Sequence, residues 1–175
     1  MIKIGLGKAL GFSLLAFIGL NFLFIIIAET ISGNLNLLFS AISSDPLIIL
    51  IIFFGPIINL PGTVINTIFG QITLGILDES LIQNIGYLVS PFVAALVAGR
   101  TGDGKGGSFG GWLISALIGS AVLGVLAFVY PSTLLYYGIL VINPIMSLIG
   151  FLLNGLVNGI FYGCFALLFS KSEMY

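Results

Sequence analysis

The stretch ALGFSLLAFIGLNFLFIIIA, residues 9–28, decides the class of this fold. It contains no charged side chain, and its length matches the roughly 20 apolar residues that a helix needs to cross a hydrocarbon core about 30 Å thick. The apolar core of a signal peptide is shorter, roughly 7–15 residues. We therefore expect residues 9–28 to form a transmembrane helix that is retained in the protein.

The composition of the whole chain points the same way. Of 175 residues, 59% are hydrophobic, and only five are basic and six acidic; the mean hydropathy is +1.26. So few charges cannot cover a water-soluble core, and no polar stretch is long enough to form a second domain. The composition predicts an all-α, polytopic transmembrane helical bundle that forms one integral membrane domain over residues 1–175.

The basic residues set the predicted topology. They occur before the first apolar run, in the loop 100–109 and after the last run: Lys3, Lys8, Arg100, Lys105 and Lys171. Cytoplasmic loops carry an excess of Lys and Arg, so we expect a plasma-membrane protein whose N- and C-termini are both cytoplasmic. This orientation predicts four spans, which are 9–28, 86–99, 110–130 and the run that ends at Ser170.

Two further apolar segments are interrupted. Gly55-Pro56 and Asn59-Leu60-Pro61-Gly62 break residues 47–77, and Asn143-Pro144 breaks residues 133–153. Proline removes a helical hydrogen bond and clashes with the preceding turn. The first segment must cross an even number of times, which favours a hairpin or a re-entrant pair of half-helices. The second is short, tilted or re-entrant, so the sequence allows four to six crossings.

Uncharged polar residues follow helical spacing in and around these broken segments. After Pro61 they occupy one face of a helix, and a narrower stripe runs through the last apolar run. The candidate residues are Asn59, Thr63, Asn66, Thr67, Gln71, Asn143, Ser147, Asn154 and Asn158. Amides in a bilayer must face protein or water. They predict a polar path, interhelical hydrogen bonds or, for residues 62–77, an amphipathic helix at the membrane interface.

Small residues recur every four positions in three of the predicted spans. The sets are Gly155, Gly159 and Gly163; Ala116, Ser120 and Gly124; and Ala95 and Gly99. Such stripes let helix backbones approach closely in a membrane, where lipid provides no hydrophobic drive for helix association. A small bundle has few internal faces, so we expect some of these stripes to contact a partner.

Groups that support chemistry are scarce. The chain has no histidine and one cysteine, Cys164, and no charged residue falls inside a predicted span. The loop 99–106 resembles a phosphate-binding loop, but Gly106 stands where that motif requires Ser or Thr. We therefore predict no enzymatic activity, no cofactor and no metal. The net charge of −1 also gives no basic face for nucleic acid.

Three hypotheses for function follow. The first is a non-enzymatic structural or accessory subunit of a larger membrane complex, whose partners are membrane lipid and other membrane protein subunits or further copies of itself. The alternative is a small channel or the substrate-binding component of a transporter, with a polar path at the Asn/Pro-broken helices. A third, a lipid-binding or membrane-remodelling protein, predicts that residues 35–42 lie flat on the outer surface.

Overall fold

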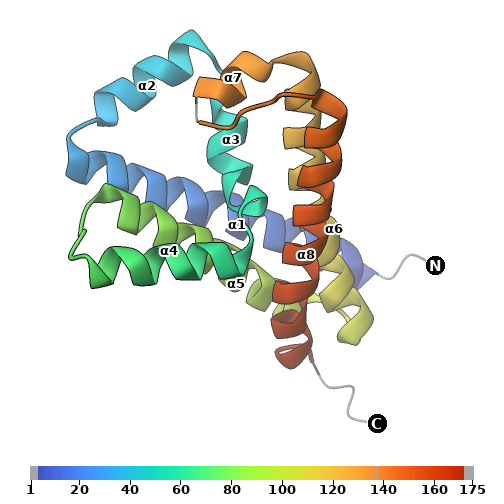
Figure 1. Cartoon of the computed structure of the whole chain (residues 1–175). Coiled ribbons are helices and arrows are strands. Elements are labelled where there is room, and N and C mark those ends of the chain that lie inside the picture. Colours follow the sequence, from blue (N-terminus) through green and yellow to red (C-terminus); the bar gives the residue numbers. More distant parts are fainter. Residues whose placement is uncertain (1–3, 137, 172–175) are drawn as a thin grey trace.

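The computed structural model describes residues 4–136 and 138–171, which are about 85% helical and contain no strand. In chain order the elements are α1 (Ile4–Ser32), α2 (Leu35–Ser44), α3 (Ile48–Phe54), the 3₁₀ helix η1 (Gly55–Ile58), α4 (Pro61–Thr73), α5 (Glu79–Thr101), α6 (Gly104–Val129), α7 (Pro131–Tyr136) and α8 (Pro144–Leu168) (Figure 1).

Within these residues, four helices are long and apolar enough to cross a membrane: α1, α5, α6 and α8. They coincide with the four predicted spans, which confirms the predicted fold class. The protein is a helical membrane protein. Helix α5 packs along α1, α8 packs along α6, and α1 crosses α6 (Figure 1).

Charge is distributed unevenly between the two ends of the bundle. At one end the α5–α6 turn lies beside the start of α1 and the end of α8: Asp103 lies against Gly5, and the Arg100 guanidinium lies 5.8 Å from the centre of the Phe169 ring. Exposed Lys8, Lys105 and Lys171 belong to this basic end.

The opposite, acidic end joins the end of α1 to the start of α5. The Gln83 amide donates to the Glu29 carboxylate at 3.4 Å. Asp78 caps α5 by accepting from the backbone N–H groups of Ser80 and Leu81. The hydrogen bond from the Ser80 hydroxyl holds the pKa of the Asp78 carboxyl below its ordinary value.

The first broken segment is re-entrant. Helix α4 is bent by 93° from α3–η1, and the contact between Glu29 and Gln83 shows that the chain leaves and re-enters the bundle at the same end. At 1.5 Å per α-helical and about 2 Å per 3₁₀ residue, α3–η1 is about 18 Å long and α4 about 20 Å. Neither half-helix can cross a core about 30 Å thick.

The second broken segment is a short connection at the acidic end. Helix α7 has six residues, and the Thr133 hydroxyl donates to the Asp45 carboxylate at 2.7 Å. The Asn143-Pro144 break coincides with the start of α8. There the Asn143 side chain accepts from the N–H groups of Ile145 and Met146, and Pro144 occupies a first-turn position that needs no N–H donor.

Helix α2 has ten residues and is also too short to span. It buries Leu38 against Ile25, Ile48 and Ile52, and it leaves Leu37 and Phe39 exposed. The prediction that residues 35–42 lie flat on the outer surface stays a prediction.

Candidate functional site

The small-residue stripes pack against other helices of the same chain. A side chain at Gly155 would overlap the Ser120 hydroxyl of α6, and one at Gly159 or Gly163 would meet Leu113 or Phe109 of the same helix. Gly124 lies against Leu148 of α8, and Gly99 lies against the carbonyl of Ala166. The α8 stripe thus packs against α6, and Gly124 and Gly99 of the other two stripes pack against α8. These contacts within the chain leave no stripe that by itself argues for a partner, although the sequence had suggested that some would contact one.

Two prolines leave two backbone carbonyls of the re-entrant pair without a helical partner. A carbonyl in an α-helix accepts from the N–H four residues later, and proline has no N–H. Pro56 therefore leaves the carbonyl of Ile52 unpaired, and Pro61 does the same to the carbonyl of Ile57. Both carbonyls belong to buried residues, where an unpaired polar group is costly.

Asparagines on neighbouring spans supply the missing donors. Asn21 of α1 donates its amide N–H to the carbonyl of Ile52. Asn158 of α8 donates to the carbonyl of Ile57 at 3.0 Å and to that of Asn59 at 3.1 Å. One turn earlier on α8, Asn154 donates to the carbonyl of Ile58 at 2.7 Å. The break in the re-entrant pair is thus held by amides from two transmembrane helices.

The surroundings of Asn158 are buried and aromatic. Its exposed fraction is 2%, and the Trp112 indole N–H donates to its backbone carbonyl at 3.3 Å. Phe17 and Tyr162 pack edge-on against Trp112. For Asn158 this geometry favours an interhelical hydrogen bond over a polar path.

Beside the break lies a pocket of about 450 Å³, here named the break pocket. Its polar side chains are Asn59, Asn154 and Tyr87, and its apolar wall includes Ile58, Ile139 and Phe151. The pocket therefore has contributions from the re-entrant pair, from α5, from α8 and from the connection that precedes α8.

The other predicted site residues lie elsewhere. Thr63, Asn66 and Thr67 are exposed on α4. Gln71 binds α5, since its amide donates to the Ser80 hydroxyl at 2.5 Å and its oxygen accepts from Asn84 at 3.1 Å.

Asn143 caps α8, and Ser147 follows it by one turn and is half-buried. Of the nine candidates, the structure brings together Asn59, Asn154 and Asn158.

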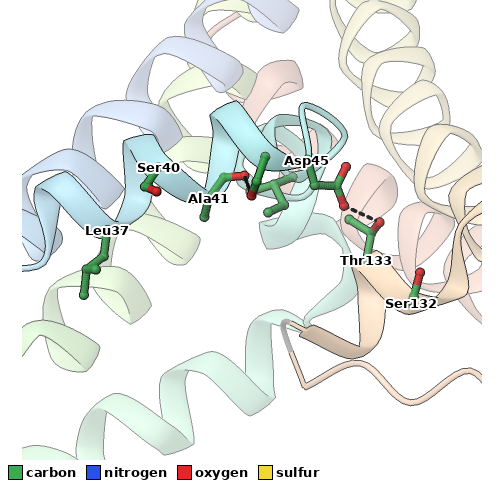
Figure 2. A pocket seen from close by; sticks show the side chains of 8 residues that line it. Leu37, Ser40, Ala41, Asp45, Ser132 and Thr133 are labelled. Carbon is green, nitrogen blue, oxygen red and sulfur yellow. Dashed lines mark hydrogen bonds between the residues drawn. The ribbon is translucent and has the colours of Figure 1, made fainter.

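A second polar pocket, of about 470 Å³, lies between α2 and α7 (Figure 2). Both oxygens of the Asp45 carboxylate are engaged there, one by the Thr133 hydroxyl and the other by the Leu47 N–H at 3.1 Å. Ser40 and Ser132 also line this pocket. Asp45 thus fastens α7 to the α2–α3 turn.

Sequence reasoning missed Asn21, which is only 1% exposed. The available signal was an amide within an otherwise apolar span, combined with a proline that must leave a carbonyl unpaired elsewhere. No family of known proteins, no curated protein and no solved structure matches this chain, so the following proposals rest on the geometry.

Proposed function

We propose that the protein is a non-enzymatic subunit of a larger membrane assembly, and that it contacts another protein subunit through the outer face of α4. This face consists of Gly62, Thr63, Asn66, Thr67 and Gly70, all of which are exposed. The observation that carries the proposal is Asn66, an exposed amide for which no hydrogen-bond partner exists among the described residues.

The depth of α4 makes this amide significant. Helix α4 packs along α5, one of the four membrane-spanning helices, and Gln71 ties the two together. The Thr67 hydroxyl donates to the carbonyl of Thr63, so it needs no external partner. The Asn66 amide makes no such internal hydrogen bond among the described residues. Placing an amide in hydrocarbon without hydrogen bonds costs about 4–8 kcal/mol. Contact of this face with lipid is therefore unfavourable.

The shape of the face favours a protein helix. Gly62 and Gly70 flank Asn66 at intervals of four residues, and no atom lies within 4 Å of where a side chain would begin at either glycine. A second helix can approach closely there and hydrogen-bond to the amide. The face carries no Lys or Arg, which helices at the membrane interface normally present to the headgroups.

The proposal also includes the orientation of the protein in the membrane. The basic end of the bundle faces the cytoplasm, following the positive-inside tendency, in a plasma membrane. The acidic end, where α2 and α7 lie, then faces outward.

Native mass spectrometry of the protein extracted in mild detergent tests the proposal. Three chains are compared: the wild type, Asn66→Leu, and the matched control Phe69→Leu, which changes an exposed apolar residue of the same helix. We expect the wild type and the control to be held in a complex and Asn66→Leu to dissociate.

The mass of the complex identifies its members as further copies or as different proteins. A wild-type chain that emerges alone contradicts the proposal, as does an Asn66→Leu complex that remains intact.

A further inference from the structure

We propose that the break pocket binds a small uncharged solute that carries hydrogen-bond donors, such as a polyol or a primary amide. This site is separate from the outer face of α4 and does not depend on the assembly proposed above.

The pocket lies between the end of η1, the spanning helices α5 and α8, and the connection that precedes α8. Its floor is the end of η1, where the first half-helix stops, and Asn154 projects from near the midpoint of the spanning helix α8. The carbonyls at the end of η1 are fixed in place, because Asn154 and Asn158 donate to those of Ile57, Ile58 and Asn59. The wall is therefore ordered before any solute arrives.

The groups that remain available are mostly acceptors. The amide nitrogen of Asn59 donates to the carbonyl of Gly55 at 3.4 Å, and that of Asn154 donates to the carbonyl of Ile58. Within the described part of the chain, no donor reaches the side-chain oxygen of either asparagine or the Tyr87 hydroxyl. Two amide oxygens and one hydroxyl suit a solute with O–H or N–H groups.

The side chains that line the break pocket indicate that the solute is uncharged. No acidic or basic side chain lines the break pocket, and an ion buried without a counter-charge is strongly disfavoured. Ile139 and Phe151 provide an apolar side. The volume of about 450 Å³ falls within the usual range of small-molecule sites, roughly 300–1,000 Å³.

A cation held by backbone carbonyls, as in selectivity filters, fits this pocket less well. The carbonyls of Ile57, Ile58 and Asn59 already accept amide N–H groups. The positive ends of those N–H dipoles would face the ion.

Cysteine accessibility in proteoliposomes tests the site. In a Cys164→Ser background, which removes the only native thiol, Asn59→Cys and Ile139→Cys place a thiol in the pocket. Ile139 donates no side-chain hydrogen bond, so its variant remains informative if Asn59→Cys folds poorly. Leu153→Cys, on the exposed side of α8 one residue from Asn154, is the matched control.

A water-soluble methanethiosulfonate reagent reacts with the thiolate, which forms only where water reaches. We expect both pocket thiols to react at least about tenfold faster than the control, and glycerol or propionamide to slow them while KCl and choline chloride do not. Reaction as slow as the control at both positions overturns the proposal, because it shows a dry pocket. So does protection by K⁺ alone, or no protection by any of these solutes.

Discussion

Replacing Asn158 by leucine tests the role of the α8 amides in holding the re-entrant pair. Leucine has a similar volume but donates no hydrogen bond. The change removes donors from the carbonyls of Ile57, Asn59 and Asn154. The carbonyl of Asn154 lies within α8 and keeps its helical partner, so the loss falls on the other two.

The magnitude follows from those two carbonyls. Pro61 denies Ile57 the usual N–H, and no backbone donor to Asn59 replaces the amide within the described residues. A buried polar group left unpaired costs about 1–3 kcal/mol, whereas interhelical hydrogen bonds in membranes average about 0.6 and reach about 1.7 kcal/mol. Since neither carbonyl can find another partner nearby, we expect Asn158→Leu to destabilise the protein by about 2–4 kcal/mol.

The assay is unfolding in bicelles with increasing SDS, followed by tryptophan fluorescence. Trp112 is the only tryptophan of the chain, and its indole N–H donates to the backbone carbonyl of residue 158. The probe thus reports on the site directly. That hydrogen bond involves only the backbone of residue 158, so the substitution itself does not remove it.

Two further variants calibrate the result. Asn154→Leu removes the donor to a single carbonyl, that of Ile58, and should cost about 1–2 kcal/mol. Leu156→Val, on the exposed side of α8, should change stability by less than about 0.5 kcal/mol. If Asn158→Leu is no less stable than Leu156→Val, the amide does not hold the break and the reasoning fails.

Two other predictions concern the packing around the break. Asn21→Leu should lower the free energy of unfolding by about 1–2 kcal/mol in the same assay. In a Pro56→Ala background the loss should be about 1 kcal/mol smaller, because alanine supplies its own N–H to the carbonyl of Ile52. Equal losses in both backgrounds contradict the pairing of Asn21 with Ile52. Gly155→Leu should destabilise the protein by about 3 kcal/mol at the α6–α8 contact. Gly150→Leu should be tolerated, because a Cβ at Gly150 meets no neighbouring atom within 4 Å. Similar losses of stability for both variants contradict the packing.

The four spans and the break within residues 47–77 were predictable from the sequence for a simple physical reason, whereas the choice between a hairpin and a re-entrant pair was left open. Bilayer thickness fixes the length of an apolar helix, as in residues 9–28, and Pro56 and Pro61 mark where helical hydrogen bonding must stop. The even number of crossings followed from the distribution of Lys and Arg along the chain. These are local properties that need no knowledge of neighbours.

The pairing of side chains was not predictable, because it depends on which helices meet. The spacing of Asn154 and Asn158 shows that they share a face but not that this face covers the end of η1. The glycine stripe of α8 indicates close packing without naming α6 as its neighbour. Periodicity groups Asn66 with Gln71, yet in the structure Gln71 binds α5 and Asn66 is left exposed.

The central claim, that the outer face of α4 contacts another protein subunit, is tested most directly by photocrosslinking in native membranes. A photoreactive amino acid is placed at Thr63, which lies on the same exposed face and leaves the Asn66 amide intact, and, as a control, at Leu153 on the exposed side of α8. The account predicts a protein adduct of defined mass from position 63 and only lipid adducts from position 153. Only lipid adducts from position 63 would contradict it.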